Sequence, residues 1–316
     1  MNLNKLIFPF ASTCLAIALT LSAPIAMANN ITFTAVPRLF NNFNSLAADP
    51  ATGYLYTYGT MGGSSTIAET LNVYDNAAAF ASGVSSHTVT LSTDFYGTYI
   101  AANNGTLYGR ASSSSTGSAT WNLNTGAQTS SSAGFSGMDT IGFNWGGYSG
   151  VAFMQDSTGT YVFGNSSANS NDWLLEHLGT GLTPTSTEIY NAGSSSLGYT
   201  FVINGELFIG SSAGNNIVTH EMNVNTGVVT PVSDTLLGLN TTASYYLSDF
   251  TYDPFTDTLY AFNTNTNSLY AATNASTQFG APSTSSSAVP TPRVLGLLAL
   301  SLLGLAFLHK KRLLTA

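Results

Sequence analysis

Histidines and carboxylates are the side chains of this sequence that could hold a metal ion or move a proton. His87, His177 and His220 stand far apart along the chain, and none has a second His or Cys at the short spacing typical of metal ligands. We interpret them as ordinary strand or loop residues. The sequence therefore predicts no metal site at the histidines and no cofactor.

Calcium is the one ion for which a candidate ligand set exists. Asp249, Asp253 and Asp257 are close in sequence, and calcium binds carboxylate and backbone oxygens. They do not match the Asp-x-Asp-x-Asp-Gly loop, and Asp253 also has the sequence context of a turn former. We keep calcium as a minor alternative and assign no metal ligand.

Nucleophilic and acid–base catalysis have no clear signature in the sequence. The segment Gly134-Phe135-Ser136-Gly137 lacks the Gly-x-Ser-x-Gly pattern of serine hydrolases. Two facing carboxylates could still hydrolyse a glycosidic bond. The acids to inspect for such a pair are Asp139, Asp172, Glu176, Glu188 and Glu221. No catalytic residue is assigned, and the interpretation leans toward a protein that is not an enzyme.

Aromatic residues between the predicted hairpins favour a binding function. Trp145 and Tyr148 form one such group, and Tyr245 and Tyr246 form another. Tyr and Trp rings stack on sugars and peptides while their polar atoms make hydrogen bonds. These four residues are the candidate ligand-binding set, and packing between repeats is the alternative explanation for the aromatic content.

The charge distribution argues against nucleic-acid partners. Between residues 29 and 279 the basic side chains are Arg38 and Arg110, whereas all 15 acidic residues lie there. Nucleic-acid binding depends on clustered Lys and Arg that neutralise phosphates. The single cysteine, Cys14, lies in the N-terminal apolar stretch, so we expect no disulfide in the mature chain.

One short phrase recurs about every fifty residues. Asp49-Pro-Ala-Thr-Gly-Tyr-Leu-Tyr56 and Asp253-Pro-Phe-Thr-Asp-Thr-Leu-Tyr260 are the closest copies, and looser copies end at Tyr108, Val162 and Phe208. Asp or Asn followed by Pro or Gly is typical of a tight turn. The flanking apolar stretches make each copy a β-hairpin.

A second phrase, Trp121-Asn-Leu-Asn-Thr-Gly126 and Met222-Asn-Val-Asn-Thr-Gly227, follows at a distance of two repeats. Two hairpins per repeat make a four-stranded sheet, the blade of a β-propeller. We therefore predict an all-β fold, a β-propeller of five four-stranded blades. A β-sandwich, a β-solenoid or six unequal blades are the alternatives. The first phrase resembles turns found in several bacterial propeller families.

The limits of the repeat domain follow from the same pattern. We expect it to cover residues 29–279, with a strand at Ile31–Val36 completing the last blade and hiding the sheet edges. A Ser-, Thr- and Pro-containing stretch at 280–288 predicts a flexible stalk.

The N-terminal residues 1–28 read as a secretion signal with a helical apolar core. Lys5 is followed by an uncharged apolar run and then by Ala26-Met27-Ala28, a small-x-small cleavage site. We predict cleavage after Ala28 by signal peptidase, following recognition by the secretion machinery.

The C-terminal residues 289–316 have three ordered parts. Val289-Pro290-Thr291-Pro292 precedes an uncharged run of 15 residues at 294–308 and then Lys310, Lys311 and Arg312. The run predicts a transmembrane helix, with the basic cluster on the cytoplasmic side. This order resembles the PEP-CTERM sorting tail of Gram-negative bacteria, whose usual motif is Val-Pro-Glu-Pro. The resemblance implies exosortase as a partner and an exopolysaccharide setting.

Two functional hypotheses follow from these segments. The first is an exported, surface-sorted, non-enzymatic protein that binds or structures extracellular polysaccharide or matrix. The second is an extracytoplasmic glycan-active enzyme, a hydrolase or lyase, with carboxylates in the propeller funnel. Both place the protein in the periplasm, on the outer surface or in the matrix, anchored at least transiently to the inner membrane.

Overall fold

The computed structural model describes most of the chain between its two ends. The described residues are 29–37, 45–58, 68–111, 117–139, 151–169, 172–179, 181–191, 198–210, 216–239, 247–263 and 268–279. Two compact units divide the chain, Met1–Gln278 and Phe279–Ala316, and the fold belongs to the first. The predicted signal at 1–28, stalk at 280–288 and tail at 289–316 fall outside the described residues and stay predictions.

Blades 1 and 2 share one long strand. Blade 1 consists of β3 (Ser45–Ala48), β4 (Leu55–Tyr58), β5 (Ala68–Tyr74) and the first half of β6 (His87–Asn103). Blade 2 consists of the second half of β6, β7 (Thr106–Arg110), β8 (Ser118–Asn122) and β9 (Gln128–Ser132). β6 pairs antiparallel with β5 up to Phe95 and with β7 from Tyr96 onward. A short helix, α2 (Ala77–Ser82), stands between β5 and β6.

The other three blades are built from successive antiparallel strands. Blade 3 consists of β11 (Ala152–Asp156), β12 (Gly159–Ser166), β13 (Asp172–Leu178) and β14 (Pro184–Asn191), with β10 (Met138–Asp139) also on β12. Blade 4 consists of β15 (Tyr199–Ile203), β16 (Glu206–Gly210), β17 (Ile217–Asn223) and β18 (Val229–Leu237). Blade 5 consists of β19 (Leu247–Asp253), β20 (Thr258–Asn263) and β21 (Ser268–Thr273), which precedes α3 (Ala275–Gln278).

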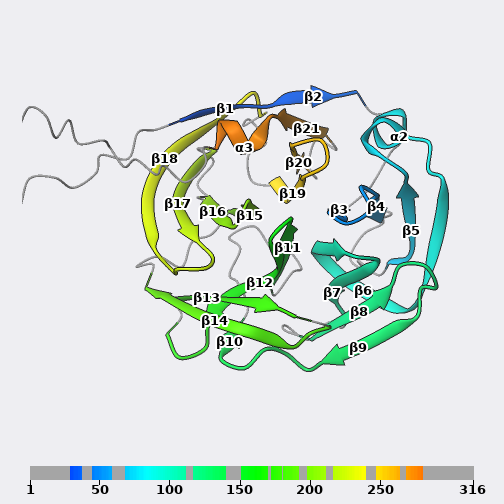
Figure 1. The fold of residues 1–316 in the computed structure, drawn as a ribbon, viewed down its shortest axis with the longest axis horizontal. Helices are drawn as coiled ribbons and strands as arrows, with labels where there is room; N and C mark the ends of the chain where they lie inside the picture. Colours follow the sequence, from blue (N-terminus) through cyan, green and yellow to red (C-terminus); the bar gives the residue numbers. More distant parts are fainter. Residues whose placement is uncertain are drawn as a thin grey trace, which may run out of the picture. The chain divides into compact units, whose positions relative to one another are not determined.

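The innermost strands close into a ring. β3 contacts β6, β6 contacts β11, β11 contacts β15, β15 contacts β19, and β19 returns to β3. Figure 1 shows this circular order down the axis of the ring. The five-bladed propeller predicted from the repeats is therefore confirmed, and the sandwich, solenoid and six-blade alternatives are wrong.

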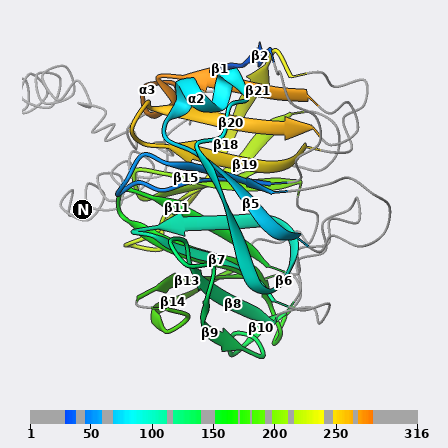
Figure 2. The same ribbon diagram turned by 90° about the vertical axis from the view of Figure 1, so that its right-hand side faces the viewer.

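The N-terminal strand serves two blades. β1 (Asn30–Thr32) pairs in parallel with β18 and adds a fifth strand to blade 4, whereas β2 (Thr34–Val36) pairs antiparallel with β21 and completes blade 5. Figure 2 shows blade 5 from the side, from β2 at the rim through β21 and β20 to β19. The predicted closing strand thus exists, but it divides at Phe33 between two neighbouring blades.

The turns between strands follow from local chemistry. Asn104-Gly105 and Asn204-Gly205 all have positive φ, between 49° and 79°, as a two-residue hairpin turn of type I′ requires. In the second repeated phrase, the side chain of Asn122 accepts hydrogen bonds from the backbone nitrogens of Asn124 and Thr125. The matching phrase has the same bonds from the nitrogens at positions 225 and 226 to the side chain at 223. The two phrases are therefore structurally equivalent.

Hydrophobic cores lie between adjacent blades. Trp121 belongs to the cluster between blades 1 and 2, and Trp173 to the cluster between blades 3 and 4. Between blades 4 and 5, Phe201 stacks on both Phe208 and Phe250, at centroid distances of 5.2 and 5.3 Å. Packing between blades therefore accounts for these aromatic residues.

Candidate functional site

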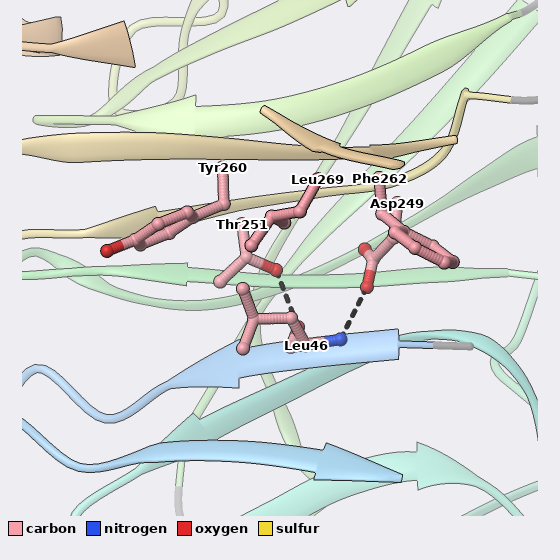
Figure 3. A pocket seen from close by; sticks show the side chains of 6 residues that line it. All are labelled: Leu46, Asp249, Thr251, Tyr260, Phe262 and Leu269. Carbon is pink, nitrogen blue, oxygen red and sulfur yellow. Dashed lines mark hydrogen bonds between the residues drawn. The ribbon is translucent and has the colours of Figure 1, made fainter. Parts of the chain in front are cut away.

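The inner strands of blades 5 and 1 meet at a buried carboxyl group on Asp249. Its Oδ2 accepts hydrogen bonds from Ser45 Oγ at 2.7 Å and from the Leu46 backbone nitrogen at 2.8 Å. Two residues along β19, Thr251 Oγ1 donates to the Leu46 carbonyl at 2.5 Å. Figure 3 shows both side chains directed from β19 toward Leu46. These bonds connect the last blade to the first, so they help to close the ring.

A third polar side chain crosses toward the same strand from blade 3. Gln155 Nε2 on β11 donates to the Ala48 carbonyl on β3 at 2.7 Å, and the Gln155 side chain is 3% exposed. A cavity lined by Gln155, Phe201, Thr251 and neighbouring inner-strand residues has a volume of about 10 Å³, close to the minimum for one water molecule. This cavity is therefore too small for a substrate.

Burial controls the protonation of this centre. Asp249 is 2% exposed, and desolvation raises the pKa of its carboxyl group to about 8. Burial and the charge of Asp249 also raise the pKa of Tyr58 and of Tyr99 well above the usual value. With no cation beside it, this shift favours the neutral form of the carboxyl group, which acts as a hydrogen-bonding group.

The two ends of the ring differ in the chain segments that they carry. We call the end where the first strand of each blade turns into the second the turn end, and the opposite end, where these first strands begin, the loop end. At the turn end, Asp49 Oδ1 accepts from the Asn104 nitrogen at 2.9 Å and Oδ2 from the Gly105 nitrogen at 2.8 Å. Asp156 Oδ2 likewise accepts from the Gly205 nitrogen at 2.7 Å. An Asp turn in blades 1 and 3 therefore binds the Asn-Gly turn of the next blade.

The three candidate calcium ligands do not share one site. Asp249 binds Ser45 and Leu46, whereas Asp253 accepts from the Phe255 nitrogen at 3.0 Å, and Asp257 accepts from Ser276 Oγ at 2.7 Å. Asp249 and Asp253 lie four residues apart on one strand, roughly 13 Å, too far for a common ion. Among the described residues, no group of three or more His, Cys, Asp or Glu could hold a metal.

The histidines of the predicted repeat domain, at 87, 177 and 220, belong to three different blades. His87 begins β6 in blade 1 and is exposed. His177 stacks on Tyr161 within blade 3 at a centroid distance of 4.8 Å. His220 of blade 4 meets the edge of Trp173 at 5.3 Å, and burial lowers the pKa of His220. His177 and His220 have packing contacts, and the three side chains are not gathered at one place.

The five acids considered for glycoside hydrolysis are also distributed. Asp139 is on β10, Asp172 and Glu176 on β13, Glu188 on β14 and Glu221 on β17. Burial raises the pKa of Glu176 and of Glu221 to about 7. Glu176 shares a face of β13 with Leu174, which packs between blades 2 and 3, and Glu221 lies on blade 4. These two protonatable acids therefore do not face each other across one cleft.

The comparison with family models decides the classification of this fold. The model of the olfactomedin-like domain matches residues 42–277, which include all five inner strands. This chain belongs to the olfactomedin-like family. Olfactomedin-like domains are typically extracellular, in agreement with the export that the N-terminal signal predicts.

Other comparisons add little to the olfactomedin-like assignment. Glutaminyl cyclase from Myxococcus xanthus is a similar solved structure, with 10% sequence identity and a TM-score of 0.49, covering 78% of this chain and 97% of that chain. Similarity at this level carries no statement about activity. The comparison with curated proteins found no match.

Described strands of the olfactomedin-like propeller flank the predicted binding aromatics in the sequence. Trp145, Tyr148, Tyr245 and Tyr246 themselves lie outside the described residues. The strands on either side are described: β10 ends at Asp139 before β11 begins at Ala152, and β18 ends at Leu237 before β19 begins at Leu247. The end of β18 and the starts of β11 and β19 lie at the loop end, because strands alternate in direction within each blade. Asp139 also lies near the loop end, because it pairs with Asn165 close to the end of β12.

We call the bonded group of Ser45, Gln155, Asp249 and Thr251 the axial centre. Of these residues the sequence pattern indicates only Asp249, as a candidate calcium ligand. Ser45 and Gln155 have partners 204 and 107 residues away. The inner-strand position of each repeat was the available signal. The sorting motif at 289–292, the basic cluster at 310–312 and the cleavage residues Ala26 and Ala28 are not among the residues that the structure describes. Neither described helix has the length and apolarity to cross a membrane.

Proposed function

We propose that this olfactomedin-like chain is an exported, non-enzymatic surface protein that binds or organises extracellular polysaccharide at its loop end. The observation that supports this most is the set of hydrogen bonds between blades at the centre of the ring. Asp249, Thr251 and Gln155 fill the centre with bonds between blades. A ligand would therefore bind on an end surface and not within a central funnel.

The charge of the chain suggests the class of polysaccharide. Arg38 and Arg110 are the basic side chains between residues 29 and 279, against 15 acids. A polyanionic glycan would meet repulsion from such a surface. A neutral polysaccharide suits it better, because aromatic rings and the many Ser, Thr and Asn side chains bind sugars without charge.

Binding can be tested with the exported mature protein on arrays of neutral and acidic glycans, with reducing-end assays for hydrolysis. We expect binding to neutral glycans without cleavage. The double variant Trp145→Ala/Tyr148→Ala and the double variant Tyr245→Ala/Tyr246→Ala should each weaken binding at least tenfold, by loss of aromatic stacking.

The turn end offers a matched control for these variants. Tyr54 and Phe255 are exposed aromatics there, at 37% and 61%, and Tyr54→Ala/Phe255→Ala should leave binding unchanged. Loss of binding in this control alone would move the ligand site to the turn end. Release of reducing sugar that persists in a purified protein would favour the glycan-active enzyme instead.

We also propose that residues 289–316 act as a PEP-CTERM-like sorting tail read by an exosortase, with the run at 294–308 held transiently in the inner membrane. The support is the order of the Pro-containing motif, the apolar run and the basic cluster. Pro290→Ala/Pro292→Ala should retain the full-length chain in the inner membrane, whereas Thr291→Glu, which restores the usual motif, should keep or increase processing. Equal mass and location for wild type and both variants would contradict this role.

A further inference from the structure

The first described residue binds a buried carboxylate on blade 4. The backbone nitrogen of Asn29 lies 2.7 Å from Oδ1 of Asp234, and Asp234 is 2% exposed. The Asn29 carbonyl accepts from the Thr235 nitrogen at 2.9 Å. Both backbone groups of Asn29 are therefore held by β18, so the sheet fixes the position of this nitrogen.

Asp234 lies among other acids. Burial raises the pKa of Glu221 on β17 to about 7, and the charges of Glu206 and Asp234 raise it further. Burial also raises the pKa of Asp234, while hydrogen bonds from Asn29 lower it. No lysine occurs between residues 29 and 279. A positive charge at the Asn29 nitrogen would therefore supply a countercharge where acidic groups accumulate.

Signal removal would create that charge. Hydrolysis of the Ala28–Asn29 peptide bond adds a hydroxyl to the Ala28 carbonyl carbon and a hydrogen to the Asn29 nitrogen. The resulting amine takes up a proton at neutral pH, since the usual pKa of an α-amino group is about 8. We propose that the α-ammonium group of Asn29, released by signal peptidase, forms an ion pair with Asp234 that stabilises the closed ring of the mature protein.

The ion pair lies at the start of the N-terminal segment that joins blades 4 and 5. Asn29 leads directly into β1 on blade 4, and β2 on blade 5 follows after Phe33. The Phe33 nitrogen donates to the Leu237 carbonyl at 2.8 Å, and the Thr32 nitrogen donates to the side chain of Gln278 at 2.8 Å. The precursor has a neutral N–H at Asn29. Signal removal therefore strengthens the interaction with Asp234 at the start of the N-terminal segment that joins blades 4 and 5.

Chemical modification of the exported mature protein tests the pair. Acetylation removes the charge of the α-amine, whereas reductive dimethylation retains it. Both reagents also modify the tail lysines, Lys310 and Lys311, if the tail is still present. In wild type, acetylation should raise the equilibrium constant of unfolding about tenfold, as expected for a charge-assisted hydrogen bond. Dimethylation should change it less than about threefold.

The variant Asp234→Asn keeps the size and the acceptor oxygen of the side chain but removes its charge. In this variant acetylation and dimethylation should have equal effects, whereas the exposed control Asp75→Asn should behave as wild type. Should Asp234→Asn fail to fold, the pKa of the α-amine in wild type, followed by pH-dependent acylation, decides the question and should lie above 8. A mature N-terminus other than Asn29, an unraised α-amine pKa, or equal effects of the two modifications in wild type would overturn the proposal.

Discussion

Carboxylates at the turn end and at the axial centre of this propeller have different roles. Asp156 at the turn end accepts four hydrogen bonds, from two groups of Thr158, from the Gly159 nitrogen and from the Gly205 nitrogen of the next blade. Asp249 at the centre accepts hydrogen bonds from Ser45 and Leu46 of the neighbouring blade 1, and burial raises its pKa to about 8. Asp156 and Asp249 are almost equally buried, at 1% and 2% exposure, so the comparison shows that similarly buried carboxyl groups can join neighbouring blades either at a turn rich in hydrogen-bond donors or between two inner strands.

Removing a turn-end carboxylate should produce the largest effect. Asp156→Ala leaves the amides of Thr158, Gly159 and Gly205 without their acceptor, and we expect the free energy of unfolding to fall by about 4 kcal/mol. Urea denaturation measures this change. Asp75→Ala, at an exposed position, should cost less than about 0.5 kcal/mol, and similar losses in both variants would contradict the blade-joining role.

The axial carboxyl group should show itself in the pH dependence of stability. Asp249 has a raised pKa when folded, so folding takes up a proton between about pH 4 and pH 8, and the free energy of unfolding falls as pH rises through this window. Each pH unit costs about 1.4 kcal/mol at full proton uptake. Asp249→Asn should therefore gain about 3 kcal/mol relative to wild type between pH 5 and pH 8.

Other buried acids also contribute to the pH dependence of the free energy of unfolding. Glu176 and Glu221 have pKa values raised to about 7, so part of the slope between pH 4.5 and pH 7 should remain in Asp249→Asn. Denaturation in urea at five pH values separates the contributions. A wild-type slope that Asp249→Asn leaves unchanged up to pH 8 would show that this carboxyl group is already ionised in the folded protein.

The smallest expected difference concerns two glycines at the turn end. Gly105 has φ of 73° and open space around an added Cβ, with Asn124 Nδ2 at 4.0 Å. Gly126 has φ of 71°, and its Cβ would lie 1.8 Å from the Thr90 carbonyl oxygen of blade 1. Gly105→Ala should cost about 1 kcal/mol from backbone strain. Gly126→Ala should cost about 2 kcal/mol more, because backbone must move.

Thermal or urea unfolding of both variants tests whether contact between blades adds to the cost of a substitution at the turn end. Equal losses would mean that positive φ alone determines the cost and that the approach of Gly126 to blade 1 is unimportant. A larger loss at Gly105 would instead indicate that its amide bond to Asp49 is sensitive to small shifts of the turn.

The sequence by itself determined the repeating architecture. Asp49 and Asp156 indicate their hairpins because their side chains accept hydrogen bonds from backbone nitrogens two residues along the chain. The Asn-Gly turns do so because positive φ at both residues is a local property of these residue types. The second phrase, around Asn122 and Asn223, is equally local. Repetition of these local signals at a regular spacing was enough to predict five blades.

Only the tertiary structure decided how the ring closes and what its centre contains. Asp249 and Ser45 are 204 residues apart, and the N-terminal strand divides between blades 4 and 5 at Phe33. Such pairings leave no periodic trace in the sequence. Desolvation, which raises the pKa of the axial carboxyl group, depends on the packing of the blades around it, and therefore exists only once the chain has folded.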